Sequence, residues 1–369
     1  MQLRVEVTDA LERIAPGDYE AFYAESQASL FYDPRFLLAA ERSPLLPALG
    51  SYYLCVFQER RLVAFLPVYL QQISTVDPLG VLRRTAGLVD DGGDLGLFSH
   101  IMHCFESTIP SVLACADVYR LLFEALAELA ARTGARYYGI LNVRDAALLA
   151  SAKDCGLHIN YMVDSFHLDA GDFRDFDDLV AQLPSEGRWE MNRQLRKFAA
   201  SGTQAHVVTP PFGGKLEQLA GMCHTTTARH GTPQYFPKEE LVQFCELCGD
   251  LVRLCVIERD GRLISGLICF EKAGVFYIWS AGMDYDQTDF SPYTISFATC
   301  YRHALERQCR RVEGGRLNFR IKTRLGLHPR QLFAITSADL ADTASLDSST
   351  GAAAIVRASP STCFSGRKE

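Results

Sequence analysis

Two apolar hairpins of similar sequence lie about two hundred residues apart in this chain of 369 residues. The first, YYLCVFQERRLVAFLPVYL, spans residues 52–70, and the second, VRLCVIERDGRLISGLICF, spans residues 252–270. Both contain the tripeptide Leu-Cys-Val near their start, and each is followed by a helical segment, a short turn and an apolar strand, at 117–143 and at 293–321. Self-similarity at so long a period predicts a duplicated domain.

The length of the chain agrees with a duplication, because 369 residues exceed one ordinary core and suffice for two domains of about 150–200 residues. Helical and strand segments alternate in both halves, which predicts an α/β (α+β) protein. We place the first domain at residues 1–165 and the second at 166–338. Residues 339–369 are rich in Ser, Ala and Thr and have no periodicity, so we expect a disordered tail there.

The composition is that of a soluble globular protein, with 48% hydrophobic and 22% charged residues. No apolar run approaches the roughly 18 residues needed to cross a bilayer, so we expect no membrane span. The first thirteen residues hold five charged side chains, which excludes the apolar core of a signal peptide. We therefore expect a cytoplasmic protein.

The twelve cysteines lie mostly in apolar runs, where cysteine behaves as a small hydrophobic residue. Cys245-x-x-Cys248 resembles half of a zinc site, but it falls on a predicted helix and no second pair stands at the spacing of a zinc finger. We expect no metal ion and no tightly bound cofactor.

A strongly basic stretch follows the second hairpin. Residues 302–330 hold nine Lys/Arg and two acids, although the chain as a whole has a net charge of −7. The spacing predicts a helix from Ile295 that ends at Gly314-Gly315, and then a strand at 317–322. So much charge of one sign indicates a bound anion, but a solvated face explains the charge alone equally well.

Three features occur only in the second half of the chain. They are the basic helix EGRWEMNRQLRK at 186–197, the loop ARHGTPQYF at 228–236, and the aromatic strand VFYIWSAGMD at 275–284. We therefore expect the first half to be a scaffold and the second half to hold the functional site.

Five segments, taken in order, point to a known family: FYDPRFLLAAERSP, FLPVYLQ, SFHLDAGDFRDFDDLVAQLPSEGRWEMNRQLRK, CYRHALE, and Glu313-Gly314 with Lys322, Gly326 and Pro329. Together they resemble the FemAB-like, peptidoglycan biosynthesis/recognition branch of the GNAT acyltransferase superfamily, over roughly residues 28–335. Two departures stand out. The family's Gln-Gly-Glu-His-Lys stretch is replaced by LNFRIK at 317–322, without the Glu and the His, and no glycine-rich pyrophosphate loop for coenzyme A is present.

The resemblance implies two tandem GNAT-like domains, each a mixed twisted sheet flanked by helices. It also implies acyl transfer without a covalent enzyme intermediate, with the carbonyl polarised by the strand at 275–284. Tyr277 and Trp279 on that strand would flank the acyl group, or else serve as core aromatics. The helix start at Ser291 would bind donor phosphates.

For the catalytic residues, the resemblance and the sequence together suggest Glu313 as the base, with His167 as the alternative and Lys322 as a further catalytic group. A capping acid and a hydrogen-bonded structural histidine are the competing interpretations of Glu313 and His167. The remaining donor- or substrate-binding candidates are basic or aromatic: Arg188, Arg193, Arg196, Tyr235, Tyr301, Arg320 and Arg324.

The resulting expectation is an acyltransferase that forms an amide bond on the amine of a small, amino-acid-like acceptor, in a specialised-metabolite or cell-wall pathway. Its donor is an acyl-CoA, a carrier-protein thioester or an aminoacyl-tRNA, and partners would include an acyl carrier protein or tRNA. The net charge of −7 argues against a large RNA footprint, so we favour the thioesters. The alternative is a non-catalytic ligand-recognition protein that keeps the fold.

Overall fold

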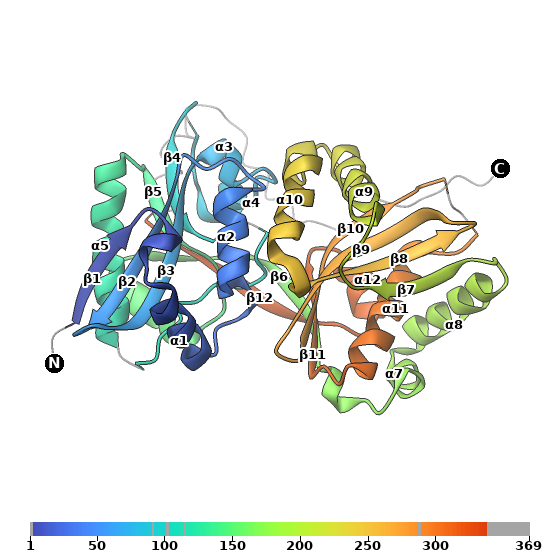
Figure 1. Cartoon of the computed structure of the whole chain (residues 1–369). Coiled ribbons are helices and arrows are strands. Elements are labelled where there is room, and N and C mark those ends of the chain that lie inside the picture. The colour runs from blue at the N-terminus through green and yellow to red at the C-terminus, as the bar shows by residue number, and fades with distance from the viewer. Residues whose placement is uncertain (1–2, 91, 101–102, 114–115, 287–288, 338–369) are drawn as a thin grey trace, which may run out of the picture.

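The computed structural model describes residues 3–90, 92–100, 103–113, 116–286 and 289–337. The tail predicted to be disordered, 339–369, lies outside these residues. In the described part of the chain, twelve strands form one sheet in the order β1-β2-β3-β4-β5-β12-β6-β11-β10-β9-β8-β7. Figure 1 shows the two halves of the chain side by side, with helices packed on the sheet.

The first half contains, within the described ranges, six strands and six α-helices. They are β1 (Leu3–Thr8), α1 (Pro16–Ser26), α2 (Pro34–Arg42), β2 (Gly50–Gln58), β3 (Arg61–Gln72), α3 (Ile73–Val76), α4 (Val81–Ala86), β4 (Leu95–Ser99), α5 (Ala116–Thr133), β5 (Tyr137–Val143), α6 (Ala146–Asp154) and β6 (His158–Leu168). The predicted hairpin and the helix at 117–133 are confirmed. Helix α2 begins where Pro34 can occupy the first helical position and the Asp33 carboxylate accepts the Arg35 N–H at 3.0 Å.

The second half begins with two helices that have no counterpart in the first and then repeats its order. Its elements are α7 (Phe176–Gln182), α8 (Ser185–Ala199), β7 (Gln204–Val208), α9 (Lys215–Arg229), η4 (Pro233–Tyr235), α10 (Lys238–Cys248), β8 (Val252–Arg259), β9 (Arg262–Lys272), β10 (Val275–Met283), α11 (Pro292–Glu306), β11 (Arg311–Arg316), α12 (Phe319–Arg324) and β12 (His328–Thr336).

The pairing of the strands also repeats. β1 to β4 pair antiparallel in sequence and β4 pairs parallel with β5, as β7 to β10 pair antiparallel and β10 pairs parallel with β11. This repeated topology confirms the tandem architecture expected from the two hairpins.

The two halves exchange their last strands. β6, which ends the first half, pairs with β11 of the second, and β12, which ends the second half, pairs with β5 of the first. β6 and β12 pair with each other and close the sheet across the middle. The expected boundary between residues 165 and 166 falls within β6, and the division of the chain into domains at that position stays a prediction.

The sequence prediction is wrong between residues 306 and 324. Helix α11 ends at Glu306, Gly314-Gly315 lie inside strand β11, and residues 319–324 form helix α12 rather than a strand. Gly314 is required for close packing, because a Cβ there would lie 2.5 Å from Cδ2 of Leu327. Gly315 has a positive φ of 70° at the point where the register of β11 against β6 shifts.

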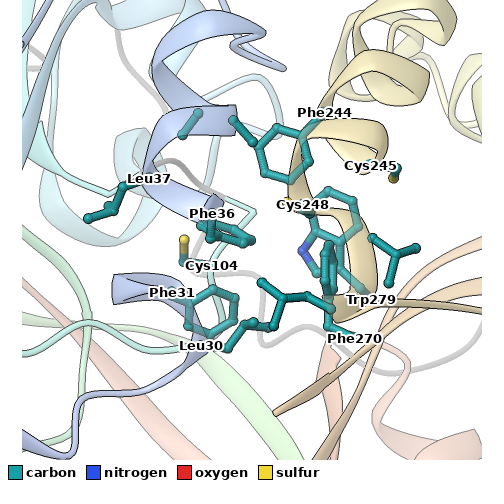
Figure 2. Packing of buried hydrophobic residues seen from close by; sticks show 14 of the residues in the cluster. Leu30, Phe31, Phe36, Leu37, Cys104, Phe244, Cys245, Cys248, Phe270 and Trp279 are labelled. Atoms are coloured by element: carbon teal, nitrogen blue, oxygen red, sulfur yellow. The ribbon is translucent and has the colours of Figure 1, made fainter. Parts of the chain in front are cut away.

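An aromatic core joins the two halves. Phe36 of α2 packs edge-to-face on Phe244 of α10, with ring centroids 5.1 Å apart, and Phe244 stacks on Trp279 of β10 at 5.6 Å. Figure 2 shows Phe36 of α2 and Phe244 of α10 on facing helices, with Trp279 of β10 beside them. Cys245 and Cys248 of the suspected zinc pair are buried free thiols in this core.

None of the helices in the described part of the chain is long and apolar enough to cross a membrane.

Candidate functional site

Strands β10 and β11 separate after three residue pairs, and this opens the sheet. Their parallel ladder ends at the pair Tyr277–Glu313. The opposite edge of β10 stays paired with β9 as far as Met283, with a register shift between Ile278 and Ser280 that leaves Trp279 as an extra residue. The backbone edge of β10 beyond Tyr277 therefore faces a gap instead of a paired neighbouring strand.

A cavity of about 190 Å³ fills this gap and reaches both faces of the sheet. Ile278 and Phe297 line it on the side of α11, and Trp279 and Phe105 line it on the opposite side. We call it the acyl cavity. The first half of the chain also contributes to its wall, with Leu79, Val81, His103, Phe105 and Val163. The first half therefore does more than support the second at this cavity, and its role as a scaffold stays a prediction.

The acyl cavity is lined by two cations, Arg316 and Lys322, and none of its described lining residues is an Asp or Glu. Lys322 is 3% exposed, its Nζ donates a hydrogen bond to the backbone carbonyl of Arg316 at 2.5 Å, and it lies 5.2 Å from the centre of the Phe166 ring. Burial, reinforced by the charge of Arg316, lowers the pKa of Lys322 to about 7. This amine can therefore exchange a proton near neutral pH.

Hydrogen bonds hold three of the other polar side chains that line the acyl cavity, those of Arg316, Tyr235 and His103. Arg316 donates to Oδ1 of Asn142 at 3.0 Å and to the hydroxyl of Tyr235 at 2.9 Å. The Nε2–H of His103 donates to the backbone carbonyl of Tyr235 at 2.6 Å, and their rings stack 4.2 Å apart. Because burial lowers the pKa of His103 to about 3, this imidazole is neutral and its Nδ1 is an acceptor that has no partner among the described residues.

Glu313 and His167 lie outside the acyl cavity. Glu313 lines a separate groove of about 980 Å³ together with Glu106, Arg144 and Tyr277. Burial raises the pKa of Glu313 to about 7, against the opposing charge of Arg330, whose Nη2 donates to Oε1 at 3.3 Å. We call this the Glu313 groove.

His167 faces Glu313 across the β6–β11 ladder, where its Nδ1 accepts a hydrogen bond from Arg330 Nε at 2.5 Å. Burial, with the nearby charge of Arg330, lowers the pKa of His167 to about 4. Two of the three expected catalytic residues therefore lie together, and the third, Lys322, lies apart from them in the acyl cavity.

The aromatic candidates also fall into two groups, those that line the acyl cavity and those that do not. Trp279 and Tyr235 line the acyl cavity, and Trp279 donates its indole N–H to the backbone carbonyl of His103 at 2.9 Å. Tyr277 lines the Glu313 groove instead. Tyr301 is fully buried and donates to the carbonyl of Leu325 at 3.0 Å, so it fixes the end of α12.

The start of α11 is less open than expected. Pro292 has no N–H, the Ser291 N–H donates to Oε1 of Gln194 at 2.7 Å, and the Thr294 N–H donates to the Ser291 hydroxyl at 3.3 Å. These groups are already bonded, so the helix start presents fewer donors for a phosphate than we expected from the sequence.

The basic candidates lie on α8 and α12, which pack against each other rather than forming two opposed jaws around an anion. Arg193 makes two hydrogen bonds to Glu190, Arg324 pairs with Glu186 at 3.3 Å, and Arg188 donates to the carbonyl of Ala181 at 2.7 Å. Arg196 and Arg320 are exposed.

Sequence reasoning missed His103, Phe105 and Asn142 because they come from the half that we took as a scaffold. Arg316 was counted in the basic stretch but not singled out. No local pattern around residues 103–105 indicates that they contact β10. Among the residues that the structure describes, no group of three or more His, Cys, Asp or Glu is placed to hold a metal ion.

Comparison with known proteins supports a GNAT-type fold. Residues 185–323 match a family described as the acetyltransferase (GNAT) domain. No curated protein sequence matches the chain.

Several solved structures are similar over nearly the whole chain. FemX has 11% identity and a TM-score of 0.61, over 92% of this chain and 99% of its own. A tandem GNAT protein from the clavulanic acid biosynthesis pathway has 12% identity and a TM-score of 0.55, over 91% and 98%. The C-terminal domain of a putative lysylphosphatidylglycerol synthetase from Agrobacterium fabrum has 13% identity and a TM-score of 0.56, over 90% and 96%. Identities this low show the fold alone, which is a tandem GNAT fold.

Proposed function

We propose that this chain, whose residues 185–323 match the GNAT acetyltransferase domain, transfers an acyl group from a thioester to the amine of an amino-acid-like acceptor. The observation that carries the proposal is the acyl cavity, which opens where β10 leaves β11. A thioester placed there has the backbone edge of β10 beside its carbonyl. Backbone N–H groups that face a developing oxyanion are among the strongest contributors to acyl transfer.

The reaction needs no covalent enzyme intermediate. The acceptor amine attacks the thioester carbonyl, the C–N bond forms, the C–S bond breaks, and the thiolate leaves. The amine must lose a proton, and the thiolate gains one. Of the titratable side chains that line the acyl cavity, Lys322 is the one with a pKa near 7, so we assign the proton from the acceptor to its neutral amine.

The cavity's charge supports an acceptor or acyl group that carries a carboxylate. Arg316 lines it, and none of its described lining residues is an Asp or Glu, so an anionic substrate group gains attraction there even when Lys322 is neutral. The neutral Nδ1 of His103 can accept a hydrogen bond from a bound amine. An amino acid carries both of these groups.

The donor is proposed to be a thioester rather than an aminoacyl-tRNA. The net charge of −7 disfavours a large RNA footprint. The similar tandem GNAT protein of the clavulanic acid biosynthesis pathway was solved in a form without AcCoA, and this association with AcCoA supports acetyl-CoA as the first donor to test. We propose amide formation as the reaction. The pathway that it serves would be either specialised metabolism or cell-wall assembly.

The test is release of free coenzyme A from acetyl-CoA when the purified full chain is mixed with a panel of amino acids and amino-acid amides. We expect release with at least one amine, loss of release in Lys322→Met, and normal release in Lys153→Met, which changes an exposed lysine on α6. Native mass spectrometry of the same mixtures measures binding. An amine that binds without any turnover of acetyl-CoA or of an acetylated carrier protein would replace this proposal with the recognition-protein alternative.

A further inference from the structure

Helices α8 and α12, with the residues just before α12, expose large apolar side chains. Trp189 is 62% exposed, Phe319 55%, Leu317 51% and Ile321 37%. Large apolar side chains grouped on one face indicate an interaction surface more often than isolated ones do. We call the exposed residues of α8 and of 317–324 the α8–α12 surface.

The two helices of this surface are in direct contact. Gly187 lies so close to α12 that a Cβ there would be 1.9 Å from the carbonyl oxygen of Arg324. The Arg324 guanidinium pairs with Glu186, and the Arg193 guanidinium covers the Trp189 ring at 5.3 Å from its centre. Figure 1 shows α8 at the outer end of the second half, away from the contact between the two halves.

The α8–α12 surface is basic in an acidic chain. The two helices carry seven Lys/Arg and two Glu, whereas the net charge of the whole chain is −7. Both acids are paired, Glu186 with Arg324 and Glu190 with Arg193. Arg196, Lys197 and Arg320 are exposed and form no ion pair with any described residue. The unpaired charge on this surface is therefore positive, and it attracts an acidic partner.

This surface adjoins the acyl cavity. Leu317 and Asn318 line the cavity, and Lys322 lies inside it. A second, separate hollow of about 150 Å³, lined by Gly187, Ile321 and Arg324 among others, lies between α8, α12 and the start of α11. A partner that contacts Leu317 on the α8–α12 surface is thus beside the wall of the acyl cavity.

We propose that the α8–α12 surface docks an acidic carrier protein, which presents the acyl group as a thioester on its phosphopantetheine arm. The inference rests on the proposed thioester chemistry and names the source of the donor. Exposed Trp, Phe and Arg, which this surface carries, are residue types enriched at protein–protein interfaces. An RNA partner would use the cations but would leave Leu317 and Ile321 without a role, and the acidic chain would repel its remaining phosphates.

The test compares two donors with the same reactive arm: an acetylated holo acyl carrier protein of bacterial fatty acid synthesis, and acetyl-pantetheine, which carries no charge. In the double variant Arg196→Glu/Arg320→Glu we expect kcat/KM with the carrier protein to fall by about tenfold or more, because both changes reverse the charge that attracts the partner. With acetyl-pantetheine we expect a change within about twofold. Arg132→Glu, a single charge reversal of the same kind at an exposed position on α5, should leave both values unchanged.

An unchanged kcat/KM with the carrier protein would overturn the docking surface while leaving the thioester chemistry in place. An equal loss of kcat/KM with both donors would also overturn the docking surface. The two arginines would then affect binding of the pantetheine arm or the stability of the fold, and not docking of the carrier protein. Fluorescence anisotropy of the labelled holo carrier protein measures docking independently of turnover. The docking surface can therefore be tested even if the chain does not catalyse acyl transfer. Tighter binding of total charged tRNA than of the carrier protein, weakened by the same double variant, would assign the surface to RNA instead.

Discussion

The side-chain nitrogen of Lys322 lies 2.5 Å from the backbone carbonyl oxygen of Arg316, so the base of the acyl cavity is closed by a bond between α12 and the end of β11. This bond places an amine in a buried position where the charged form is costly. Burial of Lys322 therefore lowers the free energy of unfolding, and the same side chain is the proton acceptor of the proposed acyl transfer.

Lys322→Met is expected to abolish most activity and to stabilise the protein. In the wild type, kcat/KM should rise as the pH passes about 7, because the neutral amine is the form that accepts a proton. The variant should lose about 100-fold or more in kcat, which is the usual contribution of a general base. The pH–rate profile of both proteins measures this.

The stability effect of Lys322→Met has a defined sign. Between the folded pKa of about 7 and the ordinary value of 10.5, the unfolded chain binds more protons than the folded one. The unfolding free energy of the wild type therefore rises with pH across that window and is lower at pH 7 than at high pH. At roughly 1.4 kcal/mol per pKa unit, the variant should gain up to about 5 kcal/mol at pH 7. Denaturant unfolding in which the variant is less stable at pH 7 would contradict the assignment.

Glu313→Gln is expected to stabilise the protein above pH 7 and to spare most of the activity. The folded pKa of about 7 lies above the ordinary 4.5, so the stability that protonated Glu313 contributes is present at low pH and is lost as the pH rises through 7. The variant should match the wild type near pH 4 and exceed it by about 3 kcal/mol at pH 8. Unfolding curves at the two pH values measure the difference.

The activity of Glu313→Gln distinguishes the two candidate bases. Because Glu313 lines its own groove and not the acyl cavity, we expect kcat to change by less than about fivefold. A loss as large as that of Lys322→Met would assign the base to Glu313, as the sequence suggested.

Much of the fold was predictable because local patterns determine it. The hairpins at 50–72 and 252–272 follow from pairs of continuous apolar runs around a polar turn, and α5 follows from its apolar periodicity. The aromatic strand β10 was located for the same reason, and with it Trp279.

The segment from α11 to α12 was not predictable in this way. A Gly-Gly pair is the signature of a turn, but here Gly314 makes room for Leu327 and Gly315 forms a bulge. Whether a glycine serves a turn or a close approach depends on what packs against it, which is a long-range contact. The same reason hid His103, which meets β10 only after the two halves have come together.

Gly187→Ala is expected to destabilise the protein by about 3 kcal/mol, because the new methyl group would overlap the Arg324 carbonyl and force α8 away from α12. Gly17→Ala is the matched control. It also changes a glycine in the first turn of a helix, α1, where a Cβ meets no atom within 4 Å. The control should be neutral or slightly stabilising, since alanine costs less entropy than glycine in a helix. Equal melting temperatures of the two variants would show that the helices are not in contact.

Phe36→Ala tests whether the two halves fold as one unit. Phe36 is fully buried at the contact between α2 and α10, so its truncation should cost about 3–5 kcal/mol and still leave a single unfolding transition. Combined with Phe244→Ala, the loss should be smaller than the sum of the single losses by about 1 kcal/mol, because the rings contact each other. Phe123→Ala, in the separate core beneath α5, should be additive with Phe244→Ala. Two resolved transitions in Phe36→Ala, one for each half, would instead mean that the exchanged strands β6 and β12 alone do not couple the halves.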